Sequence, residues 1–374
     1  MLTNTKIIQK VLKENSILLK HMISDIKFDA KYRNLKKYKT IVIIGMGGSI
    51  LGTKAIYSFL KHKIRKKFIF LDNLDENYLK QIKKNENLSK SLFLIISKSG
   101  NTDETILNMY FLKNFLKYNN TIILSENRDN FLRKIAIKNK YFFVNHNKLI
   151  GGRYSVLSNV GMLPAYLMDL KIKHFKKNLT KLINSRKFLL KLLNLIKKFK
   201  LKKKNILIFF NYIPELNDFL LWAQQLFAES LGKNQKGFIP VISNAPKDHH
   251  SLLQLYLDGP KDKIFYVFSS ERKSSIKTKS KFFDLGMQHL NKKKYNTIIN
   301  SQKNAFLTAL KSKKIAFREI KVNKFDEDTL GKLFLSFIIE TILLGKIMNI
   351  NPFDQPAVEQ VKILTKKFLK LKKS

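Results

Sequence analysis

The chain has 374 residues, enough for two domains of ordinary size, and 44% of them are hydrophobic, as in folded globular proteins. It contains no cysteine, which excludes disulfides, thiolate nucleophiles and cysteine metal sites. Its 72 Lys and Arg against 27 Asp and Glu give a net charge of +45, a balance found in nucleic-acid-binding proteins. Only eight of these cations are arginines, and the lysines are spread along the whole chain, so we expect no specific nucleic-acid partner.

No segment of the sequence is expected to enter a membrane. The first ten residues lack the uninterrupted apolar region of a signal peptide. The most apolar stretch, around residues 333–344, carries Glu340 and is shorter than a membrane span. We therefore expect a cytoplasmic protein without a membrane partner.

The predicted elements alternate between strand and helix, after about forty residues of helical pattern. The expected strands are Ile41–Ile44, Phe68–Leu71, Leu92–Ile96, Thr121–Leu124, Tyr141–Val144, Ile206–Phe210, Ile264–Phe268 and Ile315–Val322. The expected helices are Ile50–His62, Thr105–Tyr118, Leu216–Leu231, Phe282–Leu290, Asp328–Met348 and Ala357–Leu371. This alternation predicts an α/β protein with parallel sheets.

The strands fall into two sets, which predicts two domains. We expect the N-terminal helices and the first domain in residues 1–170, and a lysine-rich helical linker in 171–204. The second domain is expected in 205–350, followed by a C-terminal loop and helix in 351–374.

The segment Ser97–Thr105, with the sequence Ser-Lys-Ser-Gly-Asn-Thr-Asp-Glu-Thr, is the most informative part of the chain. It joins the end of a buried strand to the start of a helix, where free backbone N–H groups and the helix dipole attract anions. The Gly-Lys-Ser/Thr ending of a nucleotide-binding loop is missing. The segment therefore predicts a phosphorylated metabolite as ligand rather than a nucleotide.

Glycines follow two other strands at the same predicted sheet edge. Gly45-Met-Gly-Gly-Ser49 is weak evidence alone, but beside Ser97–Thr105 it is a credible second wall of a phosphate pocket. Gly151-Gly152-Arg153 places a fixed cation where it could neutralise developing negative charge. The alternative for Arg153 is a structural contact with a turn or a local carboxylate.

A carboxylate and two histidines are candidates for proton transfer. Glu229 lies on a helix whose apolar residues face inward, and partial burial would raise its pKa and suit it as a base. The commoner alternative is an ordinary surface pair. His249 and His250 diverge as neighbours and have no third ligand spaced nearby, so one of them is expected as an acid or base rather than as a zinc ligand.

The last candidate segment, Asn351–Lys362, is a loop that enters the final helix. Pro356 at the helix start is a common N-terminal device, so capping alone would explain the loop. Lys362 lies about two turns into the helix. Its spacing does not distinguish it from the many other lysines.

Five segments in this order resemble the phosphoglucose isomerase family in its short bacterial form. They are Ser97–Thr105, Gly151–Ser155, Ala228–Lys233, His250–Gln254 and Asn351–Lys362. The resemblance runs from about Ile41 to Lys362 and implies two flavodoxin-like αβα sandwich domains of the sugar-isomerase type.

The resemblance implies reversible isomerisation of D-glucose 6-phosphate and D-fructose 6-phosphate through a cis-enediolate, in glycolysis and gluconeogenesis, with no cofactor and no metal. Glu229 matches the base, Arg153 the group that stabilises the enediolate, and His250 and Lys362 the ring-opening pair. The positions that match substrate or phosphate contacts are Gly48, Ser49, Ser97, Lys98, Ser99, Thr102 and Gln355. The resemblance also implies a homodimer in which His250 is contributed across the interface.

Two departures from the family pattern leave alternatives open. The chain is short for the family, and Ala357 replaces a common glycine beside Gln355.

Three alternative functions stay open. A bifunctional phosphoglucose/phosphomannose isomerase shares the same style of phosphate loop. A non-catalytic sugar-phosphate sensor could use the same domains, and a basic RNA-associated protein is the remaining alternative.

Overall fold

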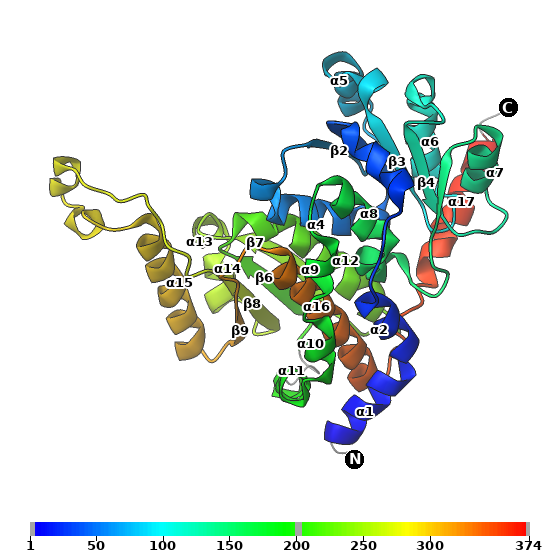
Figure 1. Ribbon diagram of the computed structural model, residues 1–374. Coiled ribbons are helices and arrows are strands. Elements are labelled where there is room, and N and C mark those ends of the chain that lie inside the picture. The colour runs from blue at the N-terminus through cyan, green and yellow to red at the C-terminus, as the bar shows by residue number, and fades with distance from the viewer. Residues whose placement is uncertain (1–3, 199–203, 372–374) are drawn as a thin grey trace.

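The computed structural model describes residues 4–198 and 204–371, which form two parallel sheets covered by helices (Figure 1). The end of the predicted helical linker, residues 199–203, lies outside the described residues. The α/β class predicted from the alternating pattern is confirmed.

The first sheet has the strand order β2-β1-β3-β4-β5, and its neighbouring strands pair in parallel. Its strands are β1 (Thr40–Gly45), β2 (Lys67–Leu71), β3 (Leu92–Ile96), β4 (Thr121–Ser125) and β5 (Phe142–Asn145). All five residues of β3 are buried, as expected for a strand with helices on both faces. The strand order changes direction next to β1: β2 lies on one side of β1, and β3, β4 and β5 follow on the other side. The loops after β1 and β3 therefore flank the crevice where such sheets bind ligands.

The second sheet has the order β7-β6-β8-β9 and is also parallel. Its strands are β6 (Ile206–Asn211), β7 (Ile239–Asn244), β8 (Lys263–Ser269) and β9 (Ala316–Lys321). We did not predict β7 from the sequence, because its run is short and contains Pro240. The strand lies at the sheet edge, where the missing N–H of proline is tolerated.

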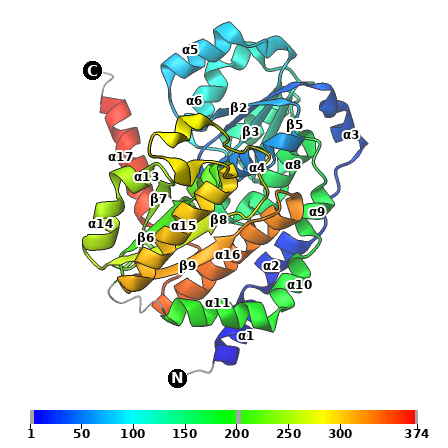
Figure 2. The same ribbon diagram turned by 90° about the vertical axis from the view of Figure 1, so that its left-hand side faces the viewer.

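The helices of the first domain are α4 (Leu51–Phe59), α5 (Glu76–Asn85), α6 (Asp103–Phe111), α7 (Phe131–Lys138) and α8 (Asn159–Leu167). Those of the second are α12 (Asn217–Leu231), α13 (Asp248–Ser251), α14 (Leu253–Asp258), α15 (Tyr295–Ser312) and α16 (Glu327–Met348). The remaining helices are α1 (Asn4–Glu14), α2 (Ser16–Ile23), α3 (Ala30–Arg33), α9 (Ile172–Lys176), α10 (Leu179–Asn184), α11 (Arg186–Lys198) and α17 (Ala357–Leu371). Figure 2 shows α17 projecting at one edge of the molecule, with the C-terminus at its free end.

One continuous core runs through both domains, and α12 lies at its centre. On one side α12 packs against α4 of the first domain, and on the other against α16 of the second. Aromatic rings fill the second contact, with Trp222 4.8 Å from Phe334 and Phe219 5.2 Å from Phe337 between ring centroids. The helix that carries Glu229 is therefore fixed from both domains.

The described helices include none that is long and apolar enough to cross a bilayer. The longest of them, α16, buries the charged Glu340, whose side chain is 1% exposed. The carboxylate accepts hydrogen bonds of 2.6 Å from Tyr266 and 2.6 Å from Arg318. These partners satisfy the buried carboxylate within the apolar middle of the helix.

The helix predicted at Phe282–Leu290 is wrong. Two short 3-10 turns, Lys281–Asp284 and Gln288–Leu290, occupy this stretch, and Gly286 lies between them at a φ of +100°. They belong to an arm, residues 270–294, that extends away from the second domain (Figure 1, yellow). Because the arm packs on no core, its apolar pattern produces no stable helix.

Candidate active site

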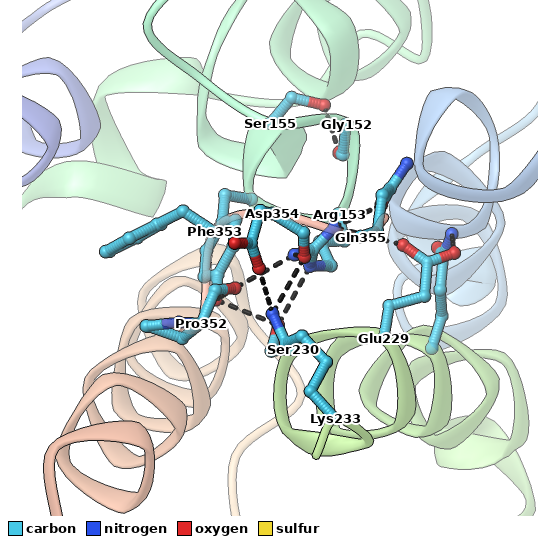
Figure 3. Close-up of polar contacts among 12 residues, drawn as sticks. Gly152, Arg153, Ser155, Glu229, Ser230, Lys233, Pro352, Phe353, Asp354 and Gln355 are labelled. Carbon is cyan, nitrogen blue, oxygen red and sulfur yellow. Dashed lines mark hydrogen bonds and ion pairs between the residues drawn. The ribbon is translucent and has the colours of Figure 1, made fainter. Parts of the chain in front are cut away.

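Four segments from both domains meet at a single buried arginine, and Figure 3 shows the side chains around it. They are the turn after β1, the 3-10 turn Gly152–Leu157, the C-terminal end of α12 and the loop of residues 351–355 before α17. The arginine is Arg153, whose side chain is 3% exposed.

Every N–H group of the Arg153 guanidinium has an acceptor. A guanidinium carries five such donors. Nε donates to Ser230 Oγ (2.8 Å), Nη1 donates to Glu229 Oε2 (3.1 Å) and Gln355 Oε1, and Nη2 donates to the carbonyls of Pro352 (2.9 Å) and Asp354 (3.0 Å). Of the three side-chain acceptors, the two long ones, Glu229 and Gln355, therefore share Nη1, Ser230 holds Nε, and backbone carbonyls hold Nη2.

Two neighbouring side chains, Tyr154 and Trp222, form hydrogen bonds with the hydrogen-bond partners of Arg153 and with its backbone carbonyl. The Tyr154 hydroxyl lies 2.9 Å from Ser230 Oγ and donates to the Pro352 carbonyl at 2.9 Å. Trp222 Nε1 donates to the Arg153 carbonyl at 3.1 Å. Burial raises the pKa of Tyr154 to about 12, so its phenol remains a donor throughout the neutral range.

Glu229 is only partly buried, as predicted, with a side chain 30% exposed. Its Oε1 accepts a hydrogen bond of 2.9 Å from Gln225 Nε2, and its Oε2 faces Arg153. Sequence reasoning missed Gln225. The available signal was its position four residues before Glu229, on the same face of α12.

Glycines allow the β1 turn to reach this cluster. Gly47 has a φ of +50°, and a Cβ there would lie 2.6 Å from Gln225 Nε2. A Cβ on Gly48 would lie 2.3 Å from the Gly152 carbonyl carbon and 2.4 Å from the Arg153 nitrogen. The two loops thus meet backbone to backbone, which gives the glycines a structural reason beyond a tight turn.

The predicted phosphate loop presents a group of hydroxyls at the start of α6. Ser97 Oγ lies 2.8 Å from Thr102 Oγ1 and 3.5 Å from Ser99 Oγ. Ser97 is buried, whereas Ser99 and Thr102 are partly exposed. The helix N-terminus and the hydroxyls together suit an anion.

Lys98 of the same loop and Ser49 of the β1 turn, which were also predicted for the pocket, lie in different settings. The Lys98 ammonium donates to the Lys148 carbonyl at 3.0 Å and lies 3.5 Å from Glu126. Ser49 is buried in the 3-10 turn after β1, where its N–H donates to the Met46 carbonyl at 3.1 Å.

Comparison with known proteins decides the family. The sequence profile of the phosphoglucose isomerase family matches residues 6–374. The chain belongs to this family. It is 34% identical to the glucose-6-phosphate isomerase of Methanocaldococcus jannaschii over 350 residues, which cover 91% of this chain and 86% of that one.

Solved structures share the fold. A hypothetical protein of Thermus thermophilus superposes with a TM-score of 0.85 at 24% identity, over 98% of this chain and 94% of its own. A glucose-6-phosphate isomerase of Chlamydia trachomatis superposes with a TM-score of 0.75 at 17% identity, over 97% of this chain and 85% of its own. The two-domain architecture implied by the family resemblance is therefore confirmed.

His250 and Lys362 lie apart from the arginine cluster. Across residues 4–198 and 204–371, no hydrogen bond or ion pair joins either side chain to Arg153 or Glu229. His250 is exposed on α13, beside a cavity of about 480 Å³. Lys362 is 56% exposed on α17 and pairs with Glu359 at 2.6 Å.

The neighbouring His249 is held in a different way. Its Nε2 lies 2.7 Å from the Tyr212 hydroxyl, and its ring stacks on Phe210 with centroids 5.6 Å apart. Burial lowers the pKa of His249. Among the described residues, no group of three His, Asp or Glu side chains could hold a metal ion.

We predict that the free energy of unfolding falls less steeply between pH 10 and pH 12 in Tyr154→Phe than in the wild type. Because the pKa of Tyr154 is about 12 when folded and about 10 when unfolded, the unfolded state ionises first as the pH rises. Tyr154 therefore contributes stability that is complete below pH 10, and about 2–3 kcal/mol of it is lost by pH 12. Urea unfolding at pH values from 8 to 12 measures this. The free energy of unfolding of the wild type minus that of the variant should fall by this amount over the range.

The matched control is Tyr118→Phe, because Tyr118 is 66% exposed. It should change neither the stability at pH 8 nor its pH dependence. A difference between wild type and Tyr154→Phe that stays constant up to pH 12 would contradict the assignment.

Proposed function

We propose that the chain catalyses the reversible isomerisation of D-glucose 6-phosphate and D-fructose 6-phosphate, with Glu229 as the base and Arg153 as the electrostatic partner. Membership in the phosphoglucose isomerase family supports the reaction. The observation that carries the assignment of residues is the 3.1 Å contact between Arg153 Nη1 and Glu229 Oε2. The protein is then an aldose–ketose isomerase of glycolysis and gluconeogenesis.

The pair accounts for the charge changes of the reaction. The C2 proton of the open-chain aldose is weakly acidic, so its removal needs a placed base and electrostatic help. When Glu229 takes this proton, its negative charge passes to the enediolate. The same guanidinium then faces the new anion, a proton passes from O2 to O1 of the enediolate, and the carboxylic acid returns its proton to C1. The charge beside Arg153 stays the same throughout.

Substrate binding requires a change at Arg153 Nη1. Both of its N–H groups are engaged by side chains, Glu229 and Gln355, while the backbone acceptors hold Nη2. We assign the enediolate to Nη1, with Gln355 moving from the arginine to a substrate hydroxyl. Nε and Nη2 keep the guanidinium plane fixed during this exchange.

The phosphate is assigned to the hydroxyls of the loop after β3, away from the reacting carbons. Ser97 Oγ lies 3.5 Å from the Ser99 hydroxyl and 2.8 Å from the Thr102 hydroxyl at the start of α6. Ser49 and the backbone of Gly48 complete the assigned pocket, and Lys98 joins it by leaving Glu126. Binding energy gained there can orient the sugar chain at Glu229.

Ring opening is assigned to His250 and Lys362, with His250 supplied by the second subunit of a homodimer. Two exposed apolar surfaces support a dimer. No described residue of α17 is buried, and Val361 and Phe368 are 67% and 61% exposed. In the arm of residues 270–294, Leu285 is 90% exposed. Surfaces of this kind commonly mark interfaces, and symmetric dimers are the commonest oligomers.

The proposed substrate of the protein is a small phosphorylated sugar. Because such sugars are produced in the cytoplasm, we propose that the protein also works there.

The first test is conversion of fructose 6-phosphate to glucose 6-phosphate in EDTA by wild type and by Glu229→Gln. We expect turnover by the wild type and a loss of about 10²–10⁴-fold in the variant, because the amide cannot accept the C2 proton. Glu215→Gln is the matched control: Glu215 pairs with Arg272 at 2.6 Å and is 31% exposed, close to the 30% of Glu229. It should keep wild-type kcat.

The outcomes separate the parts of the proposal. Turnover that survives Glu229→Gln would mean that the base is assigned wrongly. A wild type that binds fructose 6-phosphate without converting it would favour the non-catalytic sensor.

The shared site is tested by subunit mixing. Glu229→Gln and His250→Ala should each be inactive alone, because every site lacks either its base or its histidine. A mixed dimer would contain one site with both groups. Random reassembly of equal amounts should therefore restore roughly a quarter of wild-type activity. Two different tags on one particle would show that mixed dimers form. If such dimers stay inactive, the shared site is contradicted.

A further inference from the structure

We infer that Lys233, one turn beyond Glu229, is a positioning residue for the isomerase reaction, which fixes the Arg153 guanidinium through the loop of residues 351–355. The inference rests on the role proposed for Arg153. Lys233 follows the end of α12 and reaches the loop from that side (Figure 3). It is 12% exposed, although most lysines of this chain lie in solvent.

The Lys233 ammonium is saturated by the loop. Its Nζ donates to the Asp354 carboxylate at 2.6 Å, to the Asp354 carbonyl at 2.8 Å and to the Asn351 carbonyl. An ammonium has three N–H donors, so each one is used. The Asp354 carboxylate is held from its other oxygen by Asn351 Nδ2 at 3.0 Å.

One backbone oxygen connects the two cations. The Asp354 carbonyl accepts from Lys233 Nζ at 2.8 Å and from Arg153 Nη2 at 3.0 Å. The loop therefore lies between the lysine that follows α12 and the arginine from the first domain. A shift of this carbonyl would move one of the two acceptors that set the orientation of Nη2.

Apart from these two cations, Tyr154 holds the loop, through a hydrogen bond of 2.9 Å to the Pro352 carbonyl and a ring contact with Phe353. Pro352 is buried, but Asn351, Phe353, Asp354 and Gln355 are exposed. The helix that follows, α17, has no buried residue among those described. The polar contacts to Lys233 and Arg153 thus replace the core packing that fixes most loops.

The expected defect is one of rate rather than of substrate binding. Without the ammonium, the loop can move and the guanidinium loses its alignment, and a misplacement of about 1 Å can cost roughly 100-fold in rate. The assigned phosphate loop belongs to the first sheet and does not depend on this contact. A fall in kcat with little change in KM therefore distinguishes positioning from general damage.

The test compares Lys233→Met with Lys236→Met in the full-length protein. Lys236 lies three residues further on and donates to the Met348 carbonyl at 3.0 Å, so it contacts the end of α16 and not the loop. We expect Lys233→Met to lower kcat by about 10–100-fold and to change KM for fructose 6-phosphate by less than about threefold. Lys236→Met should keep wild-type kcat.

A second readout measures the arginine's alignment without turnover. A five-carbon aldonate 5-phosphate places a planar carboxylate where the enediolate forms, so its affinity depends on the guanidinium. Lys233→Met should weaken its binding by about the same factor as kcat. Equal kcat and equal analogue affinity in wild type and Lys233→Met would overturn the inference, as would an equal loss in Lys236→Met.

A variant on the loop side guards against misfolding of Lys233→Met. Asp354→Ala removes the exposed carboxylate and leaves both carbonyl acceptors, so we expect a smaller loss of kcat, several-fold. If Lys233→Met does not fold, wild-type kcat in Asp354→Ala overturns the inference. The proposed function is tested separately: it holds if the wild type turns over fructose 6-phosphate and Glu229→Gln abolishes this turnover. In that case, an unchanged kcat in Lys233→Met or Asp354→Ala overturns only the role of Lys233.

Discussion

The site depends on one guanidinium whose five N–H groups are all engaged. Arg153 is 3% exposed, and a buried cation without acceptors would be very costly. Its acceptors come from α12 and from the loop of residues 351–355, so the fold must bring both segments to the arginine before the charge can be buried. In this way the electrostatics of one residue require the close packing of both domains.

The helix α12 converts this requirement into a catalytic geometry. It carries Glu229 and Ser230 in its last turn and Lys233 follows its end, and each of the three contacts either Arg153 or the loop that holds it. Because α12 packs between α4 and α16, the proposed base and its cation are fixed by the same core. The movable contact is Gln355, which shares Nη1 with the base.

Much of the fold could be predicted, because parallel strands are short, buried apolar runs and their carboxyl ends carry the ligand loops. The strand before Ser97 and the glycine loop before Arg153 followed from this rule. The role of Lys233 could not be predicted, since it depends on how the end of α12 meets the loop of residues 351–355, far away in the chain. Nor could the sequence show that Lys98 pairs with Glu126, or that residues 281–290 lie on an arm without a core. The roles of His250 and Lys362 rest on family resemblance and stay predictions.

The dependence of the site on the guanidinium is tested most directly by the kcat of Arg153→Lys, with its KM for fructose 6-phosphate and its thermal midpoint. Lysine keeps the positive charge but places its three N–H groups on one atom, so it cannot satisfy five acceptors in a planar fork. We expect a loss of about 10²–10³-fold in kcat, a KM within a few-fold of wild type and a lower thermal midpoint. A kcat close to wild type would contradict the role given to the guanidinium, because a positive charge alone would then be enough.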